Sequence, residues 1–271
     1  MVTKDYNAIA AKHISRPSQS VRKPKFLIYS KNKKGKTTFG ISAGIDITLV
    51  LDPEDGTDEM RTKDPHRWKI SRWEDIDDAV NFIQYGKHNY QWVVVDGLTK
   101  FSNLALKYVM RLEEERSLTR IPGLVQQRDY GKAGELMKDV MMRFHSLQIG
   151  VVYTAQERQV EGGDSEDDDD VEDVTSMYVP DLPKGVKSAI NALVDVIGRL
   201  YVVRIEIEND NAEAAKTFKS ERRLWIGQSD KYDTGYRSDH SPLPDVLKNP
   251  TVPRLVRLIR TGSPAVPKTA K

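Results

Sequence analysis

The sequence predicts an α/β fold built on a mainly parallel central sheet flanked by helices, and three observations support this prediction. Short, continuous apolar runs recur along the chain, as is typical of strands buried on both faces of a sheet. Segments with apolar residues at helical spacing separate these runs. The first run, Phe26-Leu27-Ile28-Tyr29, leads into a turn rich in lysine and then into a helical segment. A strand, such a turn and a helix in this order can bind phosphate groups.

The elements follow in order from these patterns. We expect buried strands at 25–29, 47–51, 92–96 and 149–154, helices at 36–44, 72–85, 101–112, 131–147 and 189–194, late strands at 201–207 and 222–226, and a closing helix at 252–260. The late segments alternate polar and apolar residues, which favours antiparallel strands. Ser71 and Glu74 have the spacing of a capping box at the start of the helix 72–85.

Composition limits the class of protein. The chain has 271 residues and a formal net charge of +2, so it is long enough for one sizeable domain. It lacks an apolar stretch of the roughly 20 residues that span a bilayer, and its first residues do not resemble a signal peptide. We therefore expect a soluble protein of the cytoplasm that does not bind a membrane. The chain has no cysteine, which excludes disulfides, thiolate zinc sites and cysteine nucleophiles.

Charge is unevenly distributed. Residues 1–24 are basic and are expected to form an arm or a short strand laid on the core, whereas 161–180 is an acidic segment expected to be a mobile loop. The basic arm suits a polyanion, although a merely solvated tail explains it equally well. We expect one domain over 25–260 and a disordered tail over 261–271.

The turn after the first strand is a near match to the P-loop pattern Gly-x-x-x-x-Gly-Lys-[Ser/Thr]. It differs at the first glycine, which is Ser30 here. Lys36 is expected to contact the β- and γ-phosphates of a nucleotide, and Thr37 to bind Mg²⁺. The nucleotide-contacting residues expected from the pattern are Ser30, Lys31, Asn32, Lys33, Lys34, Gly35, Lys36, Thr37 and Thr38. A basic surface turn before an ordinary helix is the competing interpretation.

Three polar residues follow other predicted strands and so belong at the same edge of the sheet. Asp96 has the position of a carboxylate that holds the magnesium ion through water. Glu54 is placed to orient or deprotonate an attacking water, although it also fits a solvated acidic turn. Gln156 can sense the γ-phosphate, or it can be an ordinary polar strand end.

The order of the motifs resembles one family. The motifs are Ile28-Tyr29 to Thr37-Thr38, Leu51-Asp52-Pro53-Glu54, Trp73-Glu74-Asp75, Val94-Val95-Asp96, Asp129-Tyr130-Gly131, Tyr153-Thr154-Ala155-Gln156-Glu157 and Val194 to Leu200. Over roughly residues 24–240 they resemble phage-encoded RecA-like P-loop ATPases associated with single-strand annealing and recombination.

The resemblance implies a RecA-like P-loop NTPase core with antiparallel strands added near the C-terminus. It also implies ATP and Mg²⁺ as cofactors, single-stranded DNA as a partner, and a homo-oligomer in the form of a ring or a filament. Phage recombination or replication proteins are further expected partners, in the cytoplasm of a bacterial host. Glu54 would be the catalytic carboxylate, and Gln156 would couple ATP to a DNA-binding loop.

Two departures from the family pattern carry expectations of their own. Ser30 in place of glycine is expected to constrain the P-loop and slow hydrolysis. The run Asp167–Asp170 interrupts the loop after Gln156 and is expected to repel phosphates. That run would then act as a gate or contact a basic partner, while Lys184, Lys187 and the N-terminal lysines face the nucleic acid.

Similar ATPases also place a basic residue after the late strands, where it reaches the nucleotide of a neighbouring subunit. Arg237 or Lys231 would serve as this arginine-finger-type residue here, and a surface cation is the alternative.

Two functions remain open from the sequence. The first is an ATP-hydrolysing phage recombination protein that binds single-stranded DNA and promotes annealing or strand exchange. The second is a nucleotide-binding assembly or adaptor protein with slow or no turnover. A GTPase is disfavoured because the sequence has no Asn-Lys-x-Asp motif.

Overall fold

The computed structural model describes residues 5–16, 22–117, 119–160, 176–207 and 217–264. Its helices are α1 (Tyr6–His13), α2 (Lys36–Ile41), α3 (Trp73–Tyr85), α4 (Leu98–Arg116), α5 (Gln127–Ser146), α6 (Lys184–Leu193) and α7 (Val252–Thr261). Its strands are β1 (Lys25–Ser30), β2 (Thr48–Asp52), β3 (His66–Lys69), β4 (Trp92–Asp96), β5 (Gly150–Val160), β6 (Met177–Pro180), β7 (Val196–Ile207), β8 (Thr217–Trp225), β9 (Gly235–Tyr236) and β10 (Val246–Lys248).

The strands form one mixed sheet in the order β10-β8-β7-β1-β5-β4-β2-β3. The six strands from β7 to β3 in this order run parallel, whereas β8 and β10 at the other side are antiparallel. Strand β6 pairs with the far end of β5, and β9 pairs with the start of β7. The expected fold class, a mainly parallel sheet with antiparallel strands towards the C-terminus, is confirmed.

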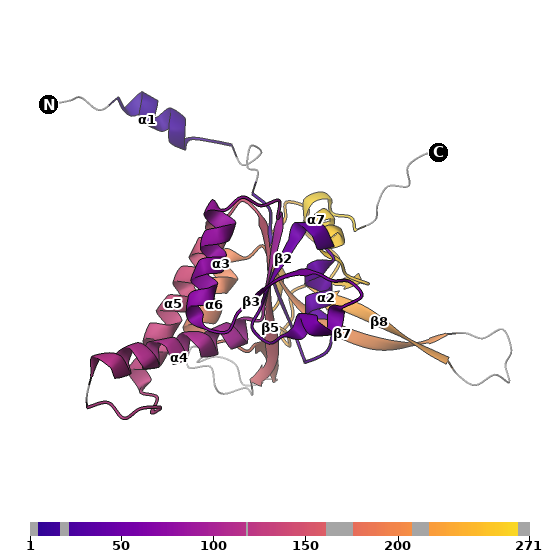
Figure 1. Ribbon diagram of the computed structural model, residues 1–271. Coiled ribbons are helices and arrows are strands. Elements are labelled where there is room, and N and C mark those ends of the chain that lie inside the picture. Colours follow the sequence, from indigo (N-terminus) through magenta and orange to yellow (C-terminus); the bar gives the residue numbers. More distant parts are fainter. Residues whose placement is uncertain (1–4, 17–21, 118, 161–175, 208–216, 265–271) are drawn as a thin grey trace, which may run out of the picture.

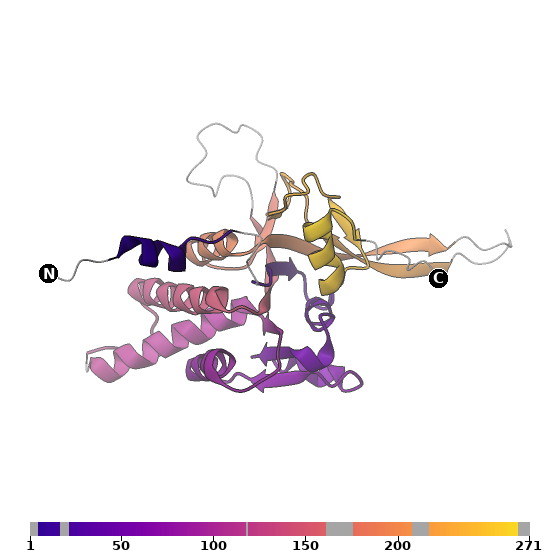
Figure 2. The same ribbon diagram turned by 90° about the horizontal axis from the view of Figure 1, so that it is seen from above.

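Two helical layers cover the sheet, one on each face (Figures 1 and 2). Alternate residues of β1 point to opposite faces, so that Leu27 and Tyr29 pack in the core under α3 to α6, and Phe26 and Ile28 in the core under α2 and α7. All six residues of β1 are buried. A strand covered on both faces needs apolar side chains at nearly every position, which explains the continuous apolar runs.

The register of the parallel strands brings the ends of three of them together. Ser30 at the end of β1 lies opposite Gln156, and Asp96 at the end of β4 lies opposite Thr154. The carboxyl edge of the sheet therefore gathers the first P-loop residue, the sensor candidate and the metal-binding candidate within two strand widths, about 10 Å.

Several elements differ from the sequence prediction. Strand β3 was not predicted, because it is an edge strand with three exposed residues and only Trp68 partly buried. Helices α4, α5 and α6 begin three to five residues earlier than expected, because each added segment holds at most one buried apolar residue, Leu98 in α4 and Val186 in α6. At the start of α3 the carboxylate of Asp75, not that of Glu74, accepts from the backbone N–H groups of Ser71 and Arg72. Glu74 pairs with Arg111 instead.

The basic segment 1–24 was expected to form an arm or a short strand laid on the core, and its described part contains helix α1, capped by the Asp5 carboxylate. The cationic side chains just before and at the start of β1 contact residues of the folded domain. Arg22 pairs with Asp195 at 2.7 Å, and Lys23 Nζ donates to Gln91. Lys25 is buried and donates to the carbonyl of Leu147 at 2.7 Å. These three cations therefore anchor the entry to β1.

Other predictions concern residues that the structure does not describe. The acidic run falls within 161–175, and most of the tail after 261 falls within 265–271, so both lie outside the described residues. Within the described ranges, no helix combines the length and the apolar character needed to cross a membrane.

Candidate nucleotide-binding site

The P-loop wraps around the start of α2. Gly35 is the N-cap of this helix with a φ of 95°, in the left-handed region that favours glycine, and Lys33 has a φ of 61°. Phe39 N donates to Gly35 O at 2.9 Å and so begins the helical hydrogen bonding. The loop thus places the N-terminus of α2, with its unpaired N–H groups, at the carboxyl edge of the sheet.

Lys36 points back into the loop. Its Nζ lies 3.2 Å from Ser30 O, 3.4 Å from Lys31 O and 3.5 Å from Gln156 Oε1. Burial lowers the pKa of Lys36, while the carboxylates of Asp96 and Glu54 act in the opposite direction. No described carboxylate pairs directly with this ammonium group, and its neighbours are neutral oxygens. A phosphate group would supply the missing counter-charge.

Thr37 and Asp96 form the part of the site suited to a metal ion. Thr37 Oγ1 donates to one oxygen of Asp96, and Thr154 Oγ1 donates to the other at 2.5 Å. The hydroxyl and carboxylate oxygens are the kind of ligand that Mg²⁺ prefers, usually together with water and substrate phosphates. No group of three acidic or histidine side chains in the described residues forms a metal site of its own. The donor set therefore fits an ion held jointly with a nucleotide.

Glu54 is carried by a turn that Asp52 organises. The buried Asp52 carboxylate accepts from Glu54 N at 3.1 Å, Gly56 N at 3.1 Å and Thr57 N at 2.9 Å. Thr57 Oγ1 adds a fourth bond at 2.5 Å. Because these bonds occupy Asp52, the exposed Glu54 is open to the site, where it lines the cavity together with Glu59.

Gln156 connects the site to the far end of β5. Its side chain faces Lys36, and its carbonyl accepts from Asp181 N at 2.8 Å. The side chain of the next residue, Glu157, is buried and pairs with Arg199 at 2.6 Å. The Arg199 guanidinium in turn lies 4.5 Å from the centre of the Tyr232 ring. A continuous chain of contacts thus leads from Lys36 to the region where β5 meets β6.

The P-loop, the Thr37–Asp96 pair, Glu54 and Gln156 surround one cavity of about 610 Å³. Of the residues predicted to form the site, the lining includes Asn32, Lys33, Gly35, Lys36, Thr37, Thr38, Glu54, Asp96 and Gln156. Lys31 and Lys34 line adjoining hollows instead. Ser30 is buried beneath the loop. The structure therefore brings most of the predicted residues to one place.

Ser30 does not strain the loop. It is the last residue of β1 and pairs with Gln156 there. It is not among the residues with positive φ, so its backbone does not require glycine. Ser30 therefore occupies its place in the P-loop without backbone strain, and the expected slowing of hydrolysis stays a prediction.

The remaining basic candidates lie outside the cavity. Arg237 donates to Ala192 O at 2.8 Å, and its backbone N–H to Asp195 O, at the amino edge of the sheet opposite the P-loop. Lys231 is an exposed residue of the loop after β8. Lys187 pairs with Asp233 at 3.4 Å, and its contact with nucleic acid stays a prediction.

Sequence reasoning missed Arg222, which lines the cavity from strand β8. It belongs to no motif, and only the three-dimensional pairing of β8 with β7 brings it to the P-loop.

Comparison with known proteins gives the following matches. The family described as an AAA domain matches residues 22–238. No curated protein matches the chain. Among solved structures, a KaiC-like protein from the hyperthermophilic archaeon Pyrococcus horikoshii is similar, with 12% sequence identity and a TM-score of 0.37. The similarity covers 79% of this chain and 82% of that one.

Proposed function

Because this chain belongs to the AAA domain family and carries a P-loop ATPase domain, we propose that it binds and hydrolyses ATP with Mg²⁺ at the cavity described above. One observation carries the proposal: Lys36, the Thr37–Asp96 pair and Gln156 converge on a single cavity from the ends of three neighbouring strands. An ordinary basic turn would not need this convergence.

Each residue of the site has its own role in this reaction. Lys36 and the N–H groups at the start of α2 bind the phosphate chain. Thr37 and Asp96 hold Mg²⁺, which when bound neutralises charge on the phosphate oxygens. Glu54 takes the proton of the attacking water, and Gln156 hydrogen-bonds near the terminal phosphate. When that hydrogen bond is lost after hydrolysis, the continuous strand β5 transmits the change in position of Gln156 to Glu157 and Arg199.

An ATPase assay tests this proposal. We expect phosphate release that requires Mg²⁺ and stops when the ion is chelated. Rapid turnover in the presence of Mg²⁺ would also exclude the alternative, an assembly or adaptor protein with slow or no turnover. Absence of both nucleotide binding and hydrolysis would remove the proposal.

We further propose that single-stranded DNA is the polymer on which this ATPase acts, in annealing or strand exchange during phage recombination in a bacterial host. Support comes from the chain of contacts from Lys36 through Gln156 to Arg199, which gives nucleotide state a route to the surface beyond the cavity. DNA should raise the ATPase rate. Its affinity should fall steeply with salt, because cations on the protein release counterions from the DNA backbone.

Assembly into a ring or filament would give Arg237 its function. Arg237 is exposed on the amino edge of the sheet, and the P-loop is on the carboxyl edge. In a head-to-tail assembly such opposite edges of successive subunits meet. Mixing Arg237→Ala with Lys36→Ala should then partly restore turnover, since one subunit supplies the arginine and the other the intact P-loop. No restoration would remove the intersubunit role.

A further inference from the structure

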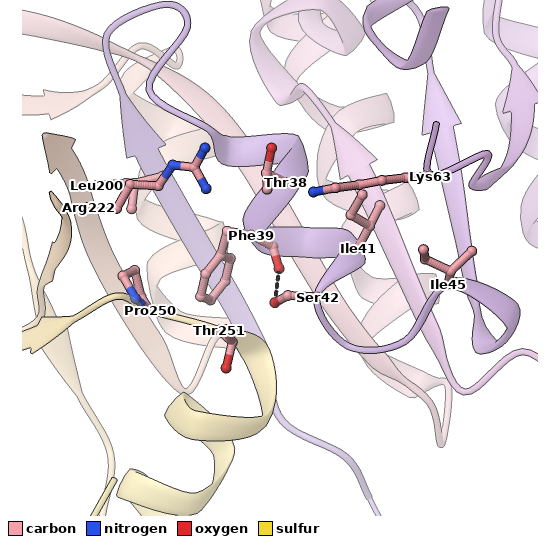
Figure 3. A pocket seen from close by; sticks show the side chains of 10 residues that line it. All are labelled: Thr38, Phe39, Ile41, Ser42, Ile45, Lys63, Leu200, Arg222, Pro250 and Thr251. Carbon is pink, nitrogen blue, oxygen red and sulfur yellow. Dashed lines mark hydrogen bonds between the residues drawn. The ribbon is translucent and has the colours of Figure 1, made fainter. Parts of the chain in front are cut away.

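Arg222 lies at the meeting point of three hollows around the P-loop. It lines the main cavity and two smaller hollows of about 340 and 420 Å³ on the side of β7 and β8. Figure 3 shows the first of these hollows, with the Arg222 side chain pointing from its strand towards Thr38 on α2. Lys33 and Lys34 line the second. No motif for nucleotide binding includes this arginine.

The direction of the Arg222 side chain is fixed by the sheet. Arg222 pairs with Val202 of β7, and its carbonyl accepts from Asn249 N at 2.8 Å. Side chains alternate along a strand, so Arg222 shares a face with the buried Leu224, which packs in the same core as Phe39 of α2. Arg223 necessarily points to the other face. The strand therefore delivers Arg222, and not its neighbour, to the P-loop.

The guanidinium group lies directly against the P-loop backbone. A Cβ atom placed on Gly35 would stand 2.8 Å from Arg222 Nε and 3.1 Å from its Cζ. In the described part of the chain, no hydrogen bond or ion pair involves this guanidinium. Two other arginines of these strands are paired, Arg223 with Glu221 at 2.8 Å and Arg199 with Glu157 at 2.6 Å. Arg222 thus adds an unpaired positive charge to the wall of a site for anions.

Strand β8, which carries Arg222, forms a two-stranded arm together with β7. Beyond Arg199, which pairs with Tyr29, strand β7 has no partner except β8 as far as Ile207. This two-stranded segment projects past the body of the sheet (Figure 1). Eight residues of strand correspond to about 26 Å. A two-stranded ribbon has little stability of its own, so a contact near its base can change its orientation.

We propose that Arg222 binds phosphate oxygens of the nucleotide within the same subunit, and that the β7–β8 arm thereby changes position with nucleotide occupancy. The inference rests on the proposed function, because it requires a nucleotide in the P-loop. A guanidinium group carries a permanent charge and a fork of donors that matches phosphate oxygens. Arg222 and Lys36 together bind the phosphate chain from two sides of the loop.

Nucleotide binding by substituted proteins tests the first half of this proposal. Titration with a fluorescent ATP analogue should show an affinity about ten- to a hundredfold weaker for Arg222→Gln than for the unsubstituted protein. Arg222→Lys should recover part of the loss. Arg223→Gln is the matched control, since it removes the adjacent charge on the opposite face, and it should bind as the unsubstituted protein does.

A probe on the arm tests the second half. The chain has no cysteine, so Lys219→Cys gives a single labelling position on an exposed residue of β8. Saturating ATP should change the emission of an environment-sensitive dye at this position. The change should be lost when Arg222→Gln is added, even at ATP concentrations that restore occupancy.

Three outcomes would overturn the inference. They are unchanged ATP affinity in Arg222→Gln, an unchanged response of the arm in that variant, and a loss confined to single-stranded DNA binding without nucleotide. The last would assign the guanidinium to phosphates of nucleic acid. In each case ATP binding by the unsubstituted protein would leave the proposed function intact, whereas no binding by that protein would remove both.

Discussion

At the scale of single residues, neighbouring aspartates at strand ends have different roles because their hydrogen-bond partners differ. Asp52 accepts three backbone N–H groups and one hydroxyl, so its oxygens serve the turn. Among the described residues, the side-chain donors to Asp96 are the hydroxyls of Thr37 and Thr154. A hydroxyl can turn away from a carboxylate when a metal ion arrives, whereas the backbone N–H groups of a folded turn cannot. This difference makes Asp96 the candidate for binding the metal ion.

Replacement of Asp96 should therefore act through the metal. In Asp96→Asn we expect the magnesium concentration for half-maximal ATPase activity to rise about ten- to a hundredfold, the usual effect of losing a group that orients metal ligands. Affinity for ATP in the absence of the ion should change little. A magnesium titration of the ATPase rate measures this. An unchanged midpoint would move the metal away from Asp96.

Glu54 can be separated from its acidic neighbours by substitution. Glu54→Gln keeps shape and hydrogen bonding but removes the base, so turnover should fall about 10²- to 10⁴-fold while ATP still binds. Glu59→Gln is the control, because Glu59 lines the same cavity and is also exposed. Steady-state rates and nucleotide affinities would be measured for both. Equal rates for Glu54→Gln and the parent would reduce Glu54 to a turn residue.

Lys25 makes stability depend on pH in the alkaline range. Burial, with Arg22 adding to it, lowers the pKa of Lys25 to about 8, whereas the unfolded value is about 10.4. Below pH 8 both states are protonated, and the cost of the buried charge is fully present. From about pH 8 to 10.4 only the unfolded chain keeps the proton, so stability rises with pH by up to about 1.4 kcal/mol per unit.

Denaturant unfolding between pH 7.5 and 9.5 measures this effect. The free energy of unfolding of the parent should rise relative to that of Lys25→Met, which cannot titrate at this position. Because the two proteins share all their other titrating groups, the difference between their free energies of unfolding reports the titration of Lys25. Parallel pH profiles for the two proteins would show that the buried amine does not change its protonation in this range.

At the scale of elements, the turn between β2 and β3 is held by one side chain. Asp52→Ala would leave buried N–H groups of the turn unsatisfied, which we expect to cost about 2 to 4 kcal/mol. Because the turn carries Glu54, ATPase turnover should fall more than ATP affinity. Asp58→Ala removes an exposed carboxylate paired with Arg67 and should cost under about 1 kcal/mol. Equal stability losses in the two variants would contradict this account.

The same scale shows how far the sequence predicts the structure. Strands β1, β2 and β4 were predicted within a residue because both faces are buried, and each reads as an apolar run. Strand β3 and helix α1 carried no such pattern. The P-loop and Asp96 could be found because their spacing is local. Arg222 could not be found, since its position depends on the pairing of β8 with β7 and on the path of β10.

At the scale of the whole molecule, the P-loop helix joins the site to the far end of the chain. Helix α2 packs with α7 in one core, and Leu255 of α7 is fully buried there. Leu255→Ala should lower the free energy of unfolding by about 2 to 5 kcal/mol. ATP should raise the melting temperature of this variant, because ligand binding stabilises the folded state. Arg260→Ala, an exposed change on the same helix, should have little effect on either quantity.

Thermal unfolding with and without ATP and Mg²⁺ measures both quantities. If Leu255→Ala and Arg260→Ala melted at the same temperature, α7 would not be part of the core that supports the P-loop.

Calorimetric binding of ATP with Mg²⁺ to the parent protein and to Lys36→Ala shows whether the P-loop cavity binds nucleotide. Lys36 is the half-buried ammonium group whose described neighbours are neutral oxygens, so it needs the phosphates that the site is built to hold. We expect saturable binding by the parent and no measurable binding by a folded Lys36→Ala variant. Equal binding by the two proteins, or none by either, would contradict this expectation.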